Sequence, residues 1–280
     1  MITNTSRKKV DDAFVLVRNE VLSSTSSEDI AYFDLHEARF RHAAYRIVEL
    51  VAPGAEILDV GSHYLHLTSV LAILGYKVSA MDVPFHATLP FVSQRATAHG
   101  VPLHVVEEDG FVAGDFFGSE RDRFDAVLFC EILEHITFNP IEFWRRVHEL
   151  LRLNGFVYVT TPNSLKLISV LGALWNLVSM RRIGLNVRQI LASATFGHHW
   201  KEYSATELKE YFSRLSPDFD VRVRKVDYGG PSADAARTLG RARTALLRLG
   251  NASGVFADNL EAVVTVRAKS PWRLHAPEAG

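Results

Sequence analysis

The chain has 280 residues, of which 48% are hydrophobic and 22% are charged, and its formal net charge is −1. These values exclude a disordered chain and give no electrostatic reason to expect binding to nucleic acid. Its one cysteine, Cys130, excludes an intramolecular disulfide and a cysteine-based metal cluster. The basic residues near the N-terminus have no apolar segment after them, so we expect no secretory signal and predict a cytoplasmic protein.

Residues 1–52 are expected to be mostly helical, with the serine-rich run at 23–27 forming a helix end or cap. Tyr32, His36 and Arg39 would then lie on a helix that precedes the first strand. A solvated helix face and a helix that contacts a ligand both fit these three side chains.

The stretch from Glu56 to Pro84 predicts a strand, a glycine turn, a helix and a second strand. The first strand leads into Asp59 and Gly61, and the second strand ends at Asp82. An acid at this second position accepts hydrogen bonds from ribose hydroxyls, and a glycine lets the backbone approach the ligand. The stretch therefore predicts a site for an adenosine-containing cofactor.

The loop after the first strand helps to choose between cofactors. A dinucleotide site needs three glycines, because the pyrophosphate lies against the helix N-terminus. Here Gly61 is followed by His63 and Leu65 at the other two positions. The loop is therefore poorly shaped for a diphosphate and remains usable for a cofactor without phosphate, such as S-adenosylmethionine. A nicotinamide-dependent oxidoreductase is the less favoured alternative, since the chain also has no Tyr-x-x-x-Lys motif.

Strands and helices continue to alternate after this stretch, as is typical of α/β proteins. We expect strands at 102–106, 124–129, 156–160, 219–226 and 260–268, and helices at 139–151, 205–215 and 233–249. Ser204 should cap the helix at 205–215, with Glu207 completing a capping box.

Three segments carry a family resemblance. The run from Asp59 to Gly75 resembles motif I of the class I S-adenosylmethionine-dependent methyltransferases. The strings FDAVLFCEILEHI and GFVYVTTPN are similar to the fourth-strand and fifth-strand motifs of small-molecule methyltransferases related to the quinone O-methyltransferases. The family pattern is Asp-x-Gly-x-Gly-x-Gly, from which His63 and Leu65 depart. A degenerate methyltransferase that only binds a partner is therefore a second alternative.

The resemblance implies a doubly wound, Rossmann-like α/β fold with a seven-stranded sheet. Its strand order would be 3-2-1-4-5-7-6 with the last strand antiparallel, together with N-terminal helices and a helical lid insertion. We expect an N-terminal helical cap at 1–52, a methyltransferase domain at 53–270 that includes the lid at 164–203, and a tail at 271–280.

The resemblance also implies a set of residues that bind S-adenosylmethionine. Arg39 would pair with the methionine carboxylate, and Asp109 would bond the adenine amine, with Asp115 as a rival for that contact. The expected cofactor-binding residues are Arg39, Asp59, Gly61, Ser62, His63, Asp82, Val83, Asp109, Gly110, Cys130 and Glu131.

Methyl transfer to a hydroxyl requires a group that accepts the hydroxyl proton. The candidates near the carboxyl ends of the strands are Glu131, Glu134, His135, His198 and His199. We favour Glu131, His135, His198 and His199 as catalytic, and we expect Glu131 and His135 to share one helical face. Simple packing, at a helix end or under the lid, is the alternative for each histidine. We predict no metal site, because the pair His63 and His66 has no matching cysteine or carboxylate pair nearby in the sequence.

The apolar run at 165–180 is too short to span a membrane. It could pack over the sheet edge, cover the acceptor pocket as a lid, or contact a membrane surface peripherally. We expect a lid and a small-molecule acceptor, with a sugar, phenol, quinol or lipid-linked hydroxyl favoured over an amine. The chain is expected to be a monomer or a homodimer.

Overall fold

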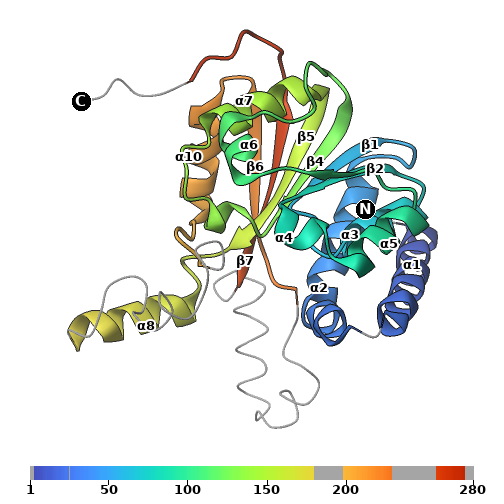
Figure 1. Cartoon of the computed structure of the whole chain (residues 1–280). Helices are drawn as coiled ribbons and strands as arrows, with labels where there is room; N and C mark the ends of the chain where they lie inside the picture. Colours follow the sequence, from blue (N-terminus) through green and yellow to red (C-terminus); the bar gives the residue numbers. More distant parts are fainter. Residues whose placement is uncertain (1–2, 25, 180–197, 229–256, 275–280) are drawn as a thin grey trace. The chain divides into compact units, whose positions relative to one another are not determined.

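The computed structural model describes residues 3–24, 26–179, 198–228 and 257–274 (Figure 1). The expected helix at 233–249, residues 180–197 of the expected lid and the end of the expected tail lie outside these residues. The described helices are α1 (Asn4–Ser23), α2 (Ser27–Leu50), α3 (His66–Ile73), α4 (Pro84–Ala87), α5 (Pro90–Ala98), α6 (Glu108–Ala113), the 3-10 helix η1 (Leu133–His135), α7 (Ile141–Leu150), α8 (Leu167–Val178) and α10 (Ala205–Leu215). The described strands are β1 (Glu56–Val60), β2 (Lys77–Asp82), β3 (Leu103–Val105), β4 (Phe124–Cys130), β5 (Leu151–Pro162), β6 (Phe219–Val226) and β7 (Asn259–Val266).

The strands form one seven-stranded sheet in the order β3-β2-β1-β4-β5-β7-β6, which confirms the predicted topology. β1 pairs in parallel with both β2 and β4, and β2 pairs in parallel with β3. β7 runs antiparallel to β5. The amide of Asn163, just after β5, donates to the carbonyl of Asp258, just before β7, while Arg267 beyond β7 reaches Asn154 near the start of β5.

The chain divides into two compact units. The first contains residues 1–129, 139–157 and 265–272, and the second contains residues 130–138, 158–264 and 273–280. Both N-terminal helices and the β1–α3–β2 segment belong to the first unit, whereas η1, α8 and α10 belong to the second.

The two N-terminal helices form where the sequence predicted them. α1 ends at Ser23, and the side chain of Ser26 accepts a hydrogen bond from the amide of Asp29 to cap α2. Val10, Phe14 and Val17 lie on one face of α1 and are fully buried, where α1 packs with α2 and α3. The prediction of a helix break at 23–27 is confirmed.

The junction between α7 and β5 differs from the prediction. We expected the helix to continue to residue 151 and the strand to begin at 156, but α7 ends at Leu150 and β5 begins at Leu151. Leu151 already has extended backbone angles, so no loop separates the two elements. Asn154 takes a positive φ within the strand, so the Asn-Gly pair between the expected helix and the expected strand lies inside β5.

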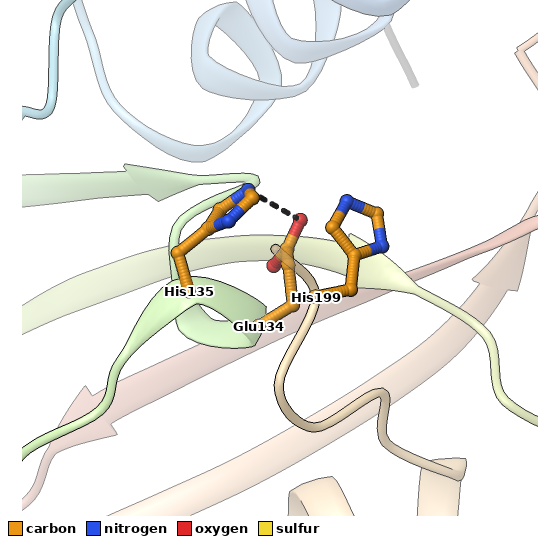
Figure 2. Close-up of side chains that lie close together, drawn as sticks. All are labelled: Glu134, His135 and His199. Atoms are coloured by element: carbon orange, nitrogen blue, oxygen red, sulfur yellow. Dashed lines mark ion pairs between the residues drawn. The ribbon is translucent and has the colours of Figure 1, made fainter. Parts of the chain in front are cut away.

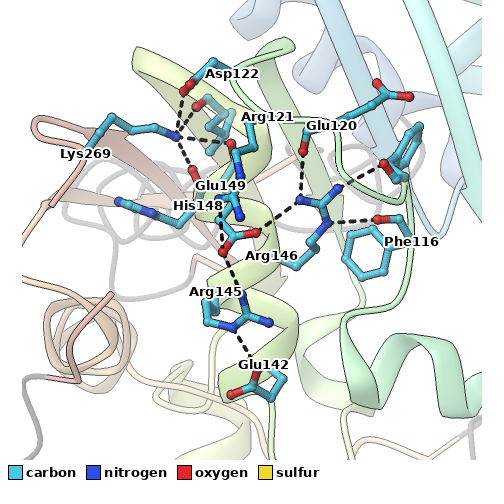
Figure 3. A network of polar contacts seen from close by, with 12 residues as sticks. Phe116, Glu120, Arg121, Asp122, Glu142, Arg145, Arg146, His148, Glu149 and Lys269 are labelled. Atoms are coloured by element: carbon cyan, nitrogen blue, oxygen red, sulfur yellow. Dashed lines mark hydrogen bonds and ion pairs between the residues drawn. The ribbon is translucent and has the colours of Figure 1, made fainter. Parts of the chain in front are cut away.

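Two basic side chains fix the surroundings of α7 (Figure 3). Lys269 donates to the carbonyl of His148, in the last turn of α7, and to that of Leu151, the first residue of β5, and it pairs with Asp122. The buried Arg146 donates to the carbonyls of Phe116, Phe117 and Glu120. Because most of these acceptors are backbone carbonyls, the network holds the loop at 116–122 against α7 and is structural.

The capping box predicted before α10 is also present. The side chain of Ser204 accepts from the amide of Glu207, and the Glu207 carboxylate accepts from the amide of Ser204. The capping box therefore fixes the C-terminal end of the segment 198–204 to the start of α10.

Candidate functional site

The loop between β1 and α3 has three residues with left-handed backbone angles. Gly61, His63 and Leu65 have φ values of +64°, +50° and +60°. Glycine adopts such angles at no cost, but each L-residue pays about 1–2 kcal/mol. The loop thus keeps the conformation of a glycine-rich motif although two of the three glycines are replaced.

Asp82, at the tip of β2, receives two backbone hydrogen bonds. One carboxylate oxygen accepts from the amide of His63 at 2.6 Å, and the other accepts from the amide of Val83 at 2.7 Å. Burial raises the pKa of Asp82 to about 6, although both amide bonds lower it. The acid that the sequence predicted to bind ribose therefore also holds the loop that faces it.

The imidazole of His63 is part of a stack of rings. Its centroid lies 4.0 Å from that of Tyr32 with the planes 10° apart, and 4.1 Å from that of His86. Burial, together with the nearby cationic groups, lowers the pKa of His63 to about 2. The side chain is therefore neutral at physiological pH, and it connects the loop to α2 and α4.

Asp59, near the end of β1, is buried and accepts a hydrogen bond from the hydroxyl of Thr68 at 2.6 Å. Burial raises the pKa of this carboxyl to about 7, and the Thr68 bond opposes the shift only in part. A group that is partly protonated at neutral pH can donate as well as accept a hydrogen bond. Its partner in this structure is a side chain of α3.

The other residues expected near the cofactor lie at several places in the fold. Asp109 is in the first turn of α6, and both Asp109 and Asp115 are exposed. Arg39 lies on α2, where it donates to the Tyr32 hydroxyl at 3.2 Å. The remaining ones are Ser62, whose side chain is buried beside the loop, Val83 before α4, Gly110 in α6, and Cys130 at the end of β4.

The second unit contains a cluster of one acid and two histidines (Figure 2). The carboxyl of Glu134 lies between the rings of His135 and His199, and one of its oxygens is 4.0 Å from His135 Nε2. Its other oxygen accepts from the Thr161 hydroxyl at 2.9 Å. His135 Nδ1 lies 3.0 Å from the carbonyl oxygen of His198, so it is this nitrogen that carries the proton in the neutral ring.

Glu134 was among the sequence candidates but was not chosen as catalytic, and the expectation that Glu131 and His135 share one helical face is wrong. Glu131 has a φ of +57° and lies before η1, so it does not share a helical face with His135. The sequence signal for Glu134 is its place next to His135, a few residues after an apolar strand. Burial of Glu134 could not be deduced from it, because Thr161 and Trp200 reach Glu134 from distant parts of the chain.

The electrostatics of this cluster suit proton transfer. Burial, reinforced by the charge of Glu131, raises the pKa of Glu134 to about 8. A hydrogen bond to Glu202 raises the pKa of His199 and favours its protonated form. The cluster therefore brings together a carboxyl that titrates near neutral pH and two imidazoles, and the imidazole of His199 is biased towards its protonated form.

The same three residues are also able to hold a cation, because the ligand atoms of Glu134, His135 and His199 all lie within 4.8 Å of one another. One carboxylate and two imidazoles suit a transition-metal ion better than magnesium. The contact of His135 Nδ1 with a backbone carbonyl is the arrangement usual for a metal-binding histidine. The sequence predicted no metal site, and its reasoning considered only His63 and His66.

The chain is similar in sequence to known methyltransferases. A family model described as a methyltransferase domain matches residues 35–221. Ubiquinone biosynthesis O-methyltransferase of Xanthomonas campestris is 27% identical over 173 residues, which cover 60% of this chain and 63% of that relative. The protein of the same name from Xanthomonas oryzae is 31% identical over 120 residues, covering 42% of this chain and 48% of the relative.

One solved structure is similar over most of the chain. It is a methyltransferase in complex with the Haloferax volcanii Trm112 methyltransferase activator, with a TM-score of 0.54 and 15% identity, and the match covers 89% of this chain and 97% of that chain. At this identity the likeness supports the fold alone. The chain spans less than two thirds of the length of the Xanthomonas relatives.

The strand order and the β1–α3 loop define a class I, Rossmann-like methyltransferase fold. Since the family model covers more than half of the sequence, the chain belongs to the methyltransferase-domain family. The cofactor is S-adenosylmethionine, as the resemblance to motif I predicted.

The raised pKa of Asp59 leads to a test of stability against pH. The carboxyl titrates at about 7 in the folded chain and near 4 in the unfolded chain, so the unfolded state loses its proton first as pH rises. The stability that Asp59 contributes is therefore fully present below pH 4 and is lost as pH rises to about 7. The difference in unfolding free energy between wild type and Asp59→Asn should fall over this range, by an amount on the order of a few kcal/mol, in denaturant titrations. A constant difference would contradict this prediction.

Proposed function

We propose that the chain transfers a methyl group from S-adenosylmethionine to a hydroxyl of a small-molecule acceptor, namely a sugar, a phenol or quinol, or a lipid-linked compound. The observation that carries the proposal is the pairing of Glu134 with His135 in the second unit, a group suited to accept a hydroxyl proton. The name of the Xanthomonas relatives, O-methyltransferases of ubiquinone biosynthesis, supports transfer to oxygen.

The reaction asks for orientation and for removal of one proton. When it is bound, the cofactor supplies a methyl group activated by a positive sulfur. The acceptor oxygen forms a bond to the methyl carbon, the carbon–sulfur bond breaks with its electron pair passing to sulfur, and the hydroxyl proton passes to the protein. The products are a methyl ether and S-adenosylhomocysteine.

His135 is the proton acceptor that the geometry favours. Its Nδ1–H donates to the carbonyl of His198, which places the lone pair on Nε2. Glu134 then lies near the nitrogen that would become protonated, and its ionised form would stabilise the resulting imidazolium. His199 is less suited as a base, because its bond to Glu202 favours the protonated ring. A positive His199 would instead stabilise negative charge that develops on the acceptor oxygen.

We assign cofactor binding to the β1–α3 loop and the tip of β2. Asp82 would accept from the ribose hydroxyls while keeping its bonds to the amides of His63 and Val83. Arg39 would pair with the methionine carboxylate, and Asp109 in α6 would bond the adenine amine. The left-handed angles at His63 and Leu65 favour an intact cofactor loop over the degenerate alternative.

Replacement of Asp82 tests the cofactor assignment. Asp82→Ala should weaken binding of S-adenosylhomocysteine by about 1.5–3 kcal/mol, because hydrogen bonds to a charged group are lost. Isothermal titration calorimetry gives the affinity, and circular dichroism checks that the variant is folded. Unchanged affinity in a folded variant would place the ribose site elsewhere.

Proton transfer is tested by single-turnover kinetics with a phenol, a quinol and a sugar hydroxyl as acceptors. His135→Ala and Glu134→Gln should each lower the rate by about 10²–10⁴-fold with little change in cofactor affinity. The wild-type rate should rise with pH through about 8, because Glu134 ionises there and favours proton transfer to His135. Glu134→Gln should remove that dependence.

The controls separate a base from a metal ion and from orientation alone. Glu210→Gln alters an exposed carboxylate of α10 and should leave the rate unchanged. Loss of activity in EDTA that Mn²⁺ restores would assign Glu134, His135 and His199 to a cation site. If Glu131→Gln, Glu134→Gln, His135→Ala, His198→Ala and His199→Ala all keep near-normal rates, catalysis relies on orientation and the acceptor is already nucleophilic, such as a neutral amine.

α8 presents an apolar surface to solvent. Leu171, Leu174, Trp175 and Val178 follow helical spacing along one face, and Trp175 and Val178 are 62% and 79% exposed. No acidic residue lies in the run at 165–180, Lys166 lies within it, and Arg181 and Arg182 follow it in the sequence. Among the described residues no helix has both the length and the hydropathy of a membrane span. We therefore propose that α8 binds peripherally to a bilayer surface, where a lipid-linked acceptor would be reached.

A charge placed on α8 tests this contact. Trp175→Glu should lower binding to phosphatidylethanolamine–phosphatidylglycerol vesicles by about tenfold or more, since burial of one such side chain is worth about 1.5–3 kcal/mol. Co-sedimentation measures the binding. Leu16→Glu, at another exposed apolar position, on α1, is the control and should bind as wild type does. If wild type ignores vesicles but dimerises in sedimentation velocity, and Trp175→Glu is monomeric, then α8 contacts a second copy of the chain.

A further inference from the structure

The β1–α3 loop needs support that its own residues do not provide. His63 and Leu65 both hold left-handed angles, which side chains with a Cβ rarely adopt. In a loop with three glycines the backbone reaches this shape freely. Here another part of the structure must keep the loop in the shape that the cofactor requires.

Asp29, in the first turn of α2, has contacts that provide this support. Its side chain is completely buried, and its two oxygens accept from Arg95 Nη1 at 3.1 Å and from Nη2 at 2.7 Å. One of these oxygens also lies 2.8 Å from His66 Nε2. Asp29 thus joins α2 to α5 and to the first residue of α3, all within the first unit.

These contacts hold the two residues on either side of Leu65 in the chain. Arg95 Nη1 also donates to the carbonyl of Tyr64, and His66 is bonded directly by Asp29. One turn further along α2, Tyr32 stacks on the ring of His63. Every residue from 63 to 66 is therefore held, or is next to a residue that is held, by α2 or by the arginine that Asp29 orients.

Fold stability alone is a poor explanation for this arrangement. Taking a carboxylate and a guanidinium out of water is costly, and well-packed apolar side chains often serve a fold equally well. Burial would raise the pKa of Asp29, but its bonds to His66 and Arg95 outweigh burial and hold that pKa below its usual value, so the group stays ionised. The directed bonds, and above all the one from Arg95 to the Tyr64 carbonyl, fix a backbone conformation, which apolar packing does less sharply.

We propose that Asp29 is a positioning residue for the cofactor, and that its clamp with Arg95 and His66 replaces the two missing glycines of the loop. This inference rests on the proposed cofactor site. Asp29 acts through Arg95 and His66 on the backbone at 64–66, and so keeps the amide of His63 directed at Asp82. Glycine at position 63 would make the loop less dependent on the clamp.

A double-mutant cycle tests the proposal by calorimetry with S-adenosylhomocysteine. Asp29→Asn should weaken binding by about tenfold or more, whereas His63→Gly in the wild-type background should bring no tenfold gain, because the clamp already holds the loop. In the Asp29→Asn background, His63→Gly should recover about threefold or more of the lost affinity, because glycine reaches the required angles without the clamp.

Two further variants keep the test valid if Asp29→Asn unfolds. Asp29→Asn combined with Arg95→Gln removes both charges, leaves no unpaired buried charge, and should show the same loss and the same recovery with His63→Gly. Arg146→Gln removes an equally buried arginine of the first unit that does not contact the loop. It should lower the melting temperature without changing the affinity for S-adenosylhomocysteine.

The outcomes are distinct. Wild-type affinity in a folded Asp29 variant overturns the proposal. A cycle in which Asp29→Asn and His63→Gly act additively also overturns it, because glycine at position 63 would then not compensate for the loss of the clamp. If Asp82→Ala also binds as wild type does, the proposed cofactor site is wrong, and the inference fails with it. If Asp82→Ala weakens binding while Asp29→Asn does not, only the inference fails.

Discussion

The left-handed turn from β1 into α3 is the constraint on which the first unit depends. The chain changes from strand to helix within residues 61–65, and three of these five residues have positive φ. The amide of Gly61 bonds the carbonyl of Met81, and the amide of His63 bonds Asp82, so the turn is attached to the end of β2. α2 then covers the turn through Tyr32, and Asp29 fastens α2 to both α3 and α5.

Buried acids in this protein fall into two groups with opposite charge states. Asp29 is ionised because two cationic or hydrogen-bonding partners surround it. Asp59 and Glu134 have few such partners, and burial raises their pKa values to about 7 and about 8. The first kind of acid fixes geometry, and the second kind changes protonation in the range where enzymes exchange protons.

The two units contribute different parts of the proposed chemistry. The first unit contains the β1–α3 loop and Asp82, which correspond to the parts of the family pattern that the sequence retains. The second unit contains the Glu134 cluster and α8. The cluster has groups suited to accept a hydroxyl proton, and α8 has an exposed apolar surface. Family membership follows from the match over 35–221, whereas our proposal for the acceptor rests on residues of the second unit.

The sequence by itself determined the seven strands, the family and the identity of the cofactor, but it did not predict the helices α4, α5, α6 and η1. Local patterns suffice for the parts that were predicted: apolar strands bounded by Gly61 and Asp82, the serines at the start of α2, and the capping box at Ser204. It also identified Asp82 and His135 as candidates, because Asp82 ends one predicted strand and His135 lies a few residues after another. The exact start of β5 was missed, since Leu150 and Leu151 are equally compatible with helix and strand.

Only the tertiary structure decided which side chains act together. Glu134 acquires its raised pKa through burial against segments far away in the sequence, and His199 reaches it from beyond residue 197. Asp29 and Arg95 are separated by 66 positions, so no local spacing connects them. The missing glycines at 63 and 65 are a sequence fact, but the sequence alone could not tell whether the loop keeps its shape. That depends on long-range hydrogen bonds, which form only when distant helices meet.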